Sequence, residues 1–125
     1  MFKHQRTVQM DAEKTFSKLR NLLKERGFVI LSFVDVQEIM KSAFSEKFNP
    51  YFILEVCNPA AARELIGLDH DFGLLLPCKV VLDQQGSETT VSMLRVSEMA
   101  GVTMGTHASE PVKYEDEIIS AIDAL

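Results

Sequence analysis

The chain has 125 residues, of which 46% are hydrophobic and 25% charged, and its formal net charge at pH 7 is −5. This length predicts one domain over residues 1–125, large enough to bury a core without disulfides or a structural metal. The acidic balance argues against a basic surface of the kind that binds nucleic acid, and it disfavours docking to an anionic membrane.

The first part of the chain predicts two strand–helix pairs. Residues 2–8 alternate weakly and predict a strand, and Asp11 begins an amphipathic helix that Gly27 ends. The apolar run 28–34 predicts a buried strand. Asp35 then caps a second helix. Apolar residues recur along this helix at helical spacing, at Val36, Ile39, Met40, Ala43 and Phe44.

A third strand and a short helix meet at the first cysteine. The apolar segment 51–56 predicts the strand. Asn58 is a favoured helix cap, and Pro59 is suited to the first helical position. Gly67 predicts the end of this helix, which we expect over residues 59–66.

The second half predicts a hairpin and a final helix. Residues 74–82 give the longest strand pattern, within which Pro77 favours an edge position or a bulge because proline donates no ladder hydrogen bond. A turn at 85–86 leads to a return strand over 88–96. The last helix spans 112–124, and the acids in its first turn suit the helix dipole.

These elements predict an α+β fold, with an antiparallel or mixed sheet and helices packed mainly on one face. The segments 51–56 and 74–82 are apolar on both faces. Either helices cover both sides of the sheet or a second subunit does, and we expect a homodimer.

Targeting segments are not visible in the sequence. The first ten residues lack the apolar stretch of a signal peptide, and no apolar run approaches the roughly 20 residues of a membrane span. We therefore expect neither nucleic acid nor a membrane among the partners. The two cysteines are typical of free thiols in a reducing cytoplasm.

Cys57 stands one residue before the predicted helix cap, Asn58. The unpaired N–H groups and positive dipole at a helix start lower the pKa of a nearby thiol and make it more reactive. The alternative is a small apolar residue that fills space beneath the helix, which is common for free cysteine.

Cys78 lies in the predicted strand 74–82 and shares a face with apolar residues, as a core residue would. With Cys57 it could form a regulated disulfide or bind a soft metal such as zinc or copper, provided that the two Cα atoms approach within about 7 Å. His70, which stands between two aspartates, would add a third ligand and leave the open position of a catalytic zinc site. A polar loop that only caps and solubilises explains His70 equally.

Three short motifs follow one another in the chain: GF at 27–28, CNPA at 57–60 and LLPC at 75–78. In this combination they resemble the family called domain of unknown function 302, over about residues 1–100. The resemblance implies a small α+β domain, similar to the TATA-box-binding-protein-like fold and often dimeric, with no established activity. It does not imply nucleic-acid binding, because fold does not fix function. It directs attention to Cys57, Asn58, Pro59, Pro77 and Cys78.

Together these observations predict a cytoplasmic, homodimeric binding or sensing module with its site between the start of the short helix and the strand that carries Cys78. The ligand would be a soft metal ion or a small apolar or electrophilic molecule, held by Cys57 and Cys78. Asn58, Pro59 and Pro77 would form the scaffold, and His70 would be a third metal ligand.

Two alternatives remain open from the sequence. The first is a thiol-dependent enzyme with Cys57 as nucleophile, which needs a base such as His70, His4 or His107 within hydrogen-bond reach. The second is a purely structural dimeric domain in which both cysteines are inert.

Overall fold

Five strands form one antiparallel sheet in the order β1-β5-β4-β3-β2 in the computed structural model, which describes residues 1–105 and 107–125. The strands are β1 (Lys3–Val8), β2 (Val29–Asp35), β3 (Tyr51–Cys57), β4 (Cys78–Gln85) and β5 (Glu88–Leu94). The helices are α1 (Ala12–Glu25), α2 (Val36–Phe44), α3 (Pro59–Leu68), α4 (Val96–Thr103) and α5 (Val112–Asp123), with a 3₁₀ helix, η1, at His70–Leu74. The predicted α+β class is confirmed.

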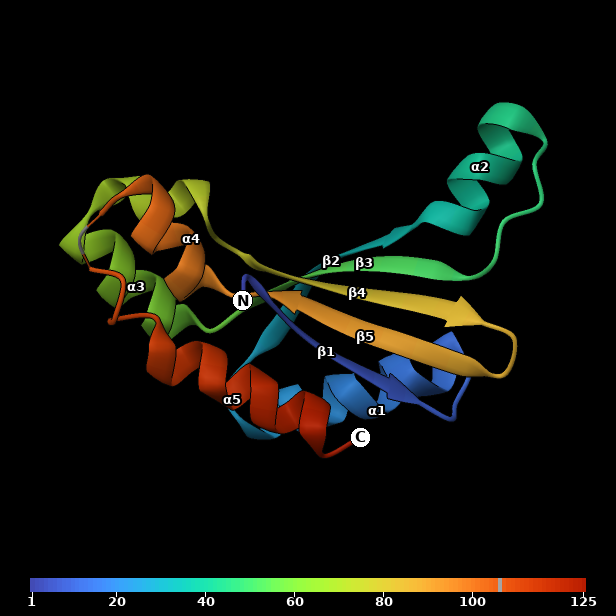
Figure 1. Ribbon diagram of the computed structural model, residues 1–125, viewed down its shortest axis with the longest axis horizontal. Helices are drawn as coiled ribbons and strands as arrows, with labels where there is room; N and C mark the ends of the chain where they lie inside the picture. The colour runs from blue at the N-terminus through green and yellow to red at the C-terminus, as the bar shows by residue number, and fades with distance from the viewer. Residues whose placement is uncertain (106) are drawn as a thin grey trace.

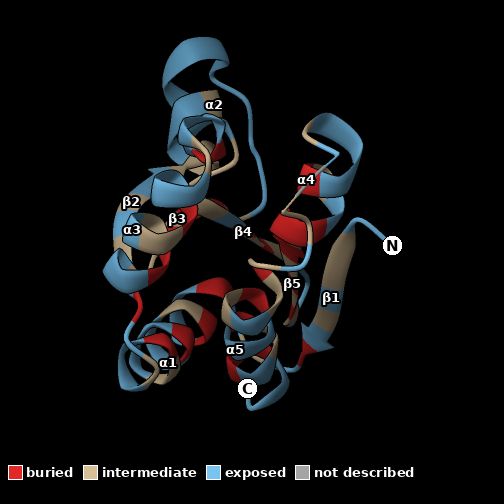
Figure 2. Ribbon diagram, turned by 90° about the vertical axis from the view of Figure 1, so that its left-hand side faces the viewer, coloured by how far each residue is buried: buried red, intermediate tan, exposed pale blue. Residues whose placement is uncertain are grey.

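The main core lies between one face of the sheet and the helices α1 and α5, which pack side by side beneath it (Figures 1 and 2). Strict alternation along β3 directs Phe52, Leu54 and Val56 into this core. The helices α3 and α4 and the 3₁₀ helix gather at one end of the sheet, where they form a smaller second cluster around Phe72.

Local sequence signals set the helix starts as predicted. The side chain of Asp11 accepts a hydrogen bond from the backbone N–H of Lys14 (2.8 Å), and Asp35 accepts from that of Glu38 (3.1 Å). Gly27 follows α1 with φ of +82°, a conformation that costs other residues free energy.

The prediction that residues 28–34 form a buried strand is wrong for most of the run. β2 is an edge strand of the sheet, and Val29, Leu31 and Phe33 are 47%, 60% and 44% exposed. An apolar run indicates a strand but not which of its faces other elements cover, and the main core forms on the one face of the sheet against which α1 and α5 pack. The helix α2 extends beyond the sheet, and none of its residues is buried (Figure 1).

Two further boundaries differ from the prediction. The segment 74–77 before Cys78 is not a strand. Its first residue, Leu74, is the last residue of η1, and β4 lies in the interior of the sheet rather than at an edge. Pro77 precedes β4, so it removes no ladder hydrogen bond, and the Leu76–Pro77 peptide is cis. Gly67 lies inside α3, which ends at Leu68 with Asp69 as its C-cap, so this glycine does not end the helix as predicted.

The helix α4 follows β5 directly and was not predicted by any sequence pattern. Its formation ends the return strand at Leu94 instead of at residue 96. Among residues 1–105 and 107–125, no helix combines the length and the apolarity needed to cross a membrane.

Candidate functional site

The two cysteines, which are 21 positions apart in the chain, line one cavity at the end of the sheet where β3 leads into α3 and β4 begins. The cavity volume is about 20 Å³, enough for one water-sized group. Its lining is mainly apolar and comes from five segments of the chain, with Phe28, Val56, Leu65, Leu76 and Val96 among the contributors. Tyr114 and Glu115 of α5 supply polar groups.

The start of α3 fixes the position of Cys57. The Asn58 side-chain oxygen accepts hydrogen bonds from the backbone N–H groups of Ala60 (3.0 Å) and Ala61 (3.2 Å), and Pro59 occupies the first turn. Two of the N–H groups expected near the thiol are therefore already paired. Cys57 is partly buried and lies immediately before this cap.

We expect Asn58→Ala to lower the free energy of unfolding by about 1 kcal/mol, because two backbone donors at the start of α3 lose their acceptor. Urea unfolding measures the change. Asn58→Asp is the matched control, since its carboxylate can accept the same hydrogen bonds and should retain the wild-type stability. Equal losses in both variants would show that the cap contributes nothing here.

Cys78 is a partly buried thiol at the start of β4, opposite Val56 in the sheet. Burial, assisted by the negative charges of Glu115 and Cys57, raises its pKa from 9.0 to about 12. Cys78 is therefore a neutral thiol at physiological pH. The two thiols lie close together, because both line the same cavity and Val56, the residue before Cys57, pairs with Cys78 across β3 and β4.

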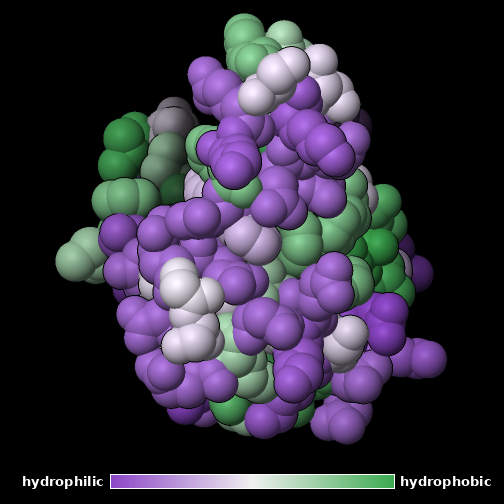
Figure 3. Space-filling model, turned by 90° about the vertical axis from the view of Figure 1, so that its right-hand side faces the viewer, coloured by the Kyte–Doolittle hydropathy of each residue, from purple (hydrophilic) through white to green (hydrophobic). Residues whose placement is uncertain are grey.

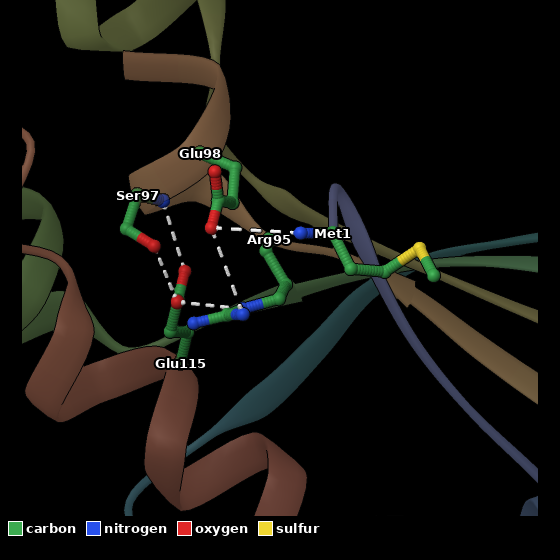
Figure 4. Close-up of polar contacts among 5 residues, drawn as sticks. All are labelled: Met1, Arg95, Ser97, Glu98 and Glu115. Atoms are coloured by element: carbon green, nitrogen blue, oxygen red, sulfur yellow. Dashed lines mark hydrogen bonds and ion pairs between the residues drawn. The ribbon is translucent and has the colours of Figure 1, made fainter. Parts of the chain in front are cut away.

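Glu115 is a carboxylate with 1% exposure that joins α5 to the start of α4. It accepts hydrogen bonds from the Ser97 backbone N–H (2.9 Å), the Ser97 hydroxyl (2.5 Å) and the Arg95 Nε (3.2 Å) (Figure 4). No side chain of α4 itself caps that helix, so Glu115 performs this role from another element. Arg95 also lies 3.7 Å from Glu98, which is 3.9 Å from the N-terminal amine of Met1.

A second polar contact links α5 to α3 beside the cavity. Glu64 of α3 accepts hydrogen bonds from the Tyr114 hydroxyl and from the Lys113 Nζ (3.2 Å). The hydrogen bond from Tyr114, followed by that from Lys113, lowers the pKa of Glu64, and the same contact raises the pKa of Tyr114. Tyr114 is thereby held at the cavity wall.

The three histidines lie apart from the cavity. His70 is exposed on η1. The ring of His4 is 2.8 Å from a carboxylate of α5, and that of His107 is 3.4 Å from a neighbouring glutamate. The structure brings Cys57 and Cys78 together but does not bring His70 to them. Within residues 1–105 and 107–125, no three His, Cys, Asp or Glu side chains gather as a metal site.

The role of Glu115 at the start of α4 was not predicted from the sequence, in which the acids at the start of the last helix suit the helix dipole. One signal was present: Glu115 is in helical register with Ile118 and Ile122, both buried, which marks it as an acid on the inward face. Its partners Arg95 and Ser97 lie 20 and 18 residues earlier, and no sequence pattern connects them.

Comparison with known proteins gives a family and a structural relative. The family model described as "Domain of unknown function DUF302" matches residues 4–125. A crystal structure of an uncharacterised conserved DUF302 protein from Bacillus stearothermophilus is similar to this chain, with a TM-score of 0.90 and 27% sequence identity. The similarity covers 98% of this chain and 97% of that one. No curated protein matches significantly.

Proposed function

The chain belongs to the DUF302 family, and we propose that it is a binding module for a small apolar or electrophilic molecule, with the cavity at Cys57 and Cys78 as its site. One observation carries this proposal: the chain's two cysteines line the same apolar cavity. Small-molecule sites are typically apolar with a few convergent polar groups, and here the thiols, Tyr114 and Glu115 are those groups.

A small molecule suits this cavity better than a soft metal ion. Metal ligation by cysteine requires a thiolate, and burial makes the Cys78 thiolate costly to form. Two thiols without a third ligand also fall short of the usual zinc set. In the proposed site Cys57 is the thiol that meets the ligand, and Cys78 is part of the apolar wall.

The proposal includes a homodimer in the cytoplasm. Support for the dimer comes from the apolar side chains that β2 and α2 expose to solvent. Support for the compartment comes from the two cysteines, which are both free.

Alkylation of Cys57 by maleimides of increasing apolar length tests the site. Each rate is divided by the rate of the same reagent with the unfolded chain, which removes intrinsic reactivity. A group that enters the cavity gains about 0.8 kcal/mol per buried methylene. N-ethylmaleimide should therefore react about fourfold faster than N-methylmaleimide on this normalised scale, because the cavity has room for about one further methylene.

Ala62→Leu is the matched variant, because Ala62 lines the cavity and is only partly buried. It should abolish the length preference while leaving Cys57 reactive. A wild-type chain without any length preference would contradict the proposal. If zinc or copper binds stoichiometrically and protects both thiols from alkylation, the ligand is a metal ion and not a small molecule. If both thiols react only after the chain is unfolded, the purely structural alternative is favoured.

A further inference from the structure

The cavity at Cys57 and Cys78 is smaller than the class of ligand proposed for it. Its volume of about 20 Å³ holds one water-sized group, whereas sites for small molecules typically measure about 300–1,000 Å³. An apolar molecule longer than about one methylene therefore reaches Cys57 only if part of the wall moves. Pockets of this kind are open in a minor conformation that the ligand stabilises. The residue that moves then sets the size of the ligand.

Tyr114 is the part of the wall best able to move. Among the residues that line the cavity, it has the largest side chain that is not fully buried. Phe28, Leu65 and Val96 of the same wall are at most 3% exposed and belong to the two core clusters. Such close-packed side chains cannot turn without displacing their neighbours. Tyr114 packs against both clusters from outside, so its ring can turn with less disturbance of either core.

The position of the Tyr114 ring is held by three residues, Glu64, Lys113 and Tyr114 itself, here called the latch. The latch joins α3 to the start of α5, which lie side by side at one end of the sheet (Figure 1). Glu64 accepts a hydrogen bond from the Tyr114 hydroxyl and another from the Lys113 Nζ, which also lies 5.0 Å from the centre of the Tyr114 ring. The side chains of Glu64 and Lys113 are 38% and 63% exposed. Water can therefore replace the hydrogen bonds of the latch, and its opening requires little free energy.

We propose that Tyr114 is the gate of this cavity, which sets how large a ligand reaches Cys57, and that Glu64 is a positioning residue that holds the gate closed. In the closed state the Tyr114 ring forms part of the wall and its hydroxyl is bonded to Glu64. In the open state the ring turns toward solvent, and the apolar chain of the ligand takes its place against the second cluster. Because a longer ligand binds only the open state, its apparent affinity is multiplied by the open fraction.

This inference deepens the small-molecule site proposed above and rests on it. It does not depend on the proposed homodimer, because all three residues of the latch and the whole lining of the cavity come from one chain.

N-Butylmaleimide tests the gate, because its alkyl chain is too long for the closed cavity, whereas that of N-methylmaleimide is not. The measured quantity is the ratio of the two alkylation rates of Cys57, each normalised to the unfolded chain. This ratio cancels any general change in the reactivity of the thiol. Glu64→Ala should raise the ratio about fivefold, because a hydrogen bond to a charged but partly exposed acceptor no longer holds the gate closed.

Three variants show whether Glu64 acts through Tyr114. Glu64→Gln keeps an oxygen that can accept from the Tyr114 hydroxyl, so its ratio should rise less than about twofold. Tyr114→Leu removes the gate, and Glu64→Ala should then change the ratio by less than about twofold, because the two effects are not additive. Glu46→Ala removes an equal charge from the segment between α2 and β3 and should leave the ratio unchanged. That segment belongs to the opposite end of the molecule, shown in Figure 3, where hydrophilic side chains predominate.

A crystal structure of the chain alkylated at Cys57 by N-butylmaleimide gives a direct view of the gate. We expect the butyl chain against the second cluster, with the Tyr114 ring turned to solvent and its hydroxyl released from Glu64. A butyl chain inside the cavity beside an intact hydrogen bond from Tyr114 to Glu64 would overturn the proposal.

The rate measurements separate failure of the gate from failure of the site. A wild-type chain that prefers N-ethylmaleimide to N-methylmaleimide, but whose N-butyl ratio responds to Glu64→Ala no more than to Glu46→Ala, would overturn the gate alone. A fivefold response to Glu64→Ala that persists in Tyr114→Leu would do the same, because Glu64 would then act without Tyr114. A wild-type chain without any length preference would remove the binding site and the gate together.

Discussion

We expect Glu115→Ala to lower the free energy of unfolding by about 3 kcal/mol, which corresponds to a fall in Tm of about 10 °C for a domain of this size. The substitution removes the acceptor of three hydrogen bonds at once. The Ser97 N–H is buried and has no alternative acceptor from α4, and Arg95, which is 29% exposed, loses its closest carboxylate. The partial exposure of Arg95 keeps the loss toward the lower end of the range for a broken buried ion pair.

Two variants separate the role of Glu115 from that of negative charge in general. Asp116→Ala removes an exposed acid from the next position and should change the free energy of unfolding by less than about 0.5 kcal/mol. Glu115→Gln keeps the shape of the side chain and one hydrogen-bond acceptor but removes the charge. Its loss in the free energy of unfolding should therefore lie between those of Asp116→Ala and Glu115→Ala. Urea unfolding of the three variants provides the comparison. Similar stabilities for Glu115→Ala and Asp116→Ala would contradict a structural role for this carboxylate.

The sequence predicts most of the secondary structure because the relevant interactions are local. The caps at Asp11, Asp35 and Asn58 accept hydrogen bonds from backbone N–H groups within three residues of themselves, so the residue type and its immediate context suffice to predict them. The placement of β2 was not predictable in the same way. Its apolar residues would have been equally consistent with an interior strand, and only the pairing of all five strands places it at the edge.

The candidate site was predictable only in part. The motif at Cys57 and Asn58 and the strand at Cys78 pointed to the correct end of the sheet, and the register of β3 with β4 brings the two motifs together. The opposite wall could not be inferred, because Val96, Tyr114 and Glu115 reach the cavity through the packing of α4 and α5. His70 has a side chain that can bind a metal, which made it a candidate third ligand. It lies on η1, away from the cavity, and this position depends on tertiary packing that no local pattern predicts.

Cys78 should be the least reactive thiol of the folded chain. With a pKa of about 12, its thiolate fraction near pH 8 is about a thousandfold smaller than that of an ordinary thiol. In Cys57→Ser, where Cys78 is the remaining thiol, iodoacetamide should react about fiftyfold more slowly with the native than with the unfolded chain, because the greater nucleophilicity of a more basic thiolate offsets part of its scarcity. Similar rates in the two states would show that Cys78 is accessible and ordinary.

The same pKa makes the stability depend on pH in a defined direction. A pKa raised in the folded state contributes stability that is present below the unfolded pKa and is lost as the pH rises through the folded value. Relative to Cys78→Ala, the free energy of unfolding of the wild type should stay constant below pH ~8.5 and fall by about 1.5 kcal/mol near pH ~10. A difference that does not vary with pH would contradict the raised pKa.

Glu115 connects the reactivity of Cys78 with the stability of α4. Its negative charge is the second cause of the raised pKa of Cys78, after burial. Glu115→Gln should therefore accelerate the alkylation of Cys78, although it lowers the free energy of unfolding. The acceleration should be largest below pH ~9, where little of Cys78 is present as thiolate. Asp116→Asn, an equal charge change directed to solvent, should leave the rate unchanged. A rate that responds to both variants alike would mean that the opening of the cavity, and not the charge of Glu115, governs this thiol.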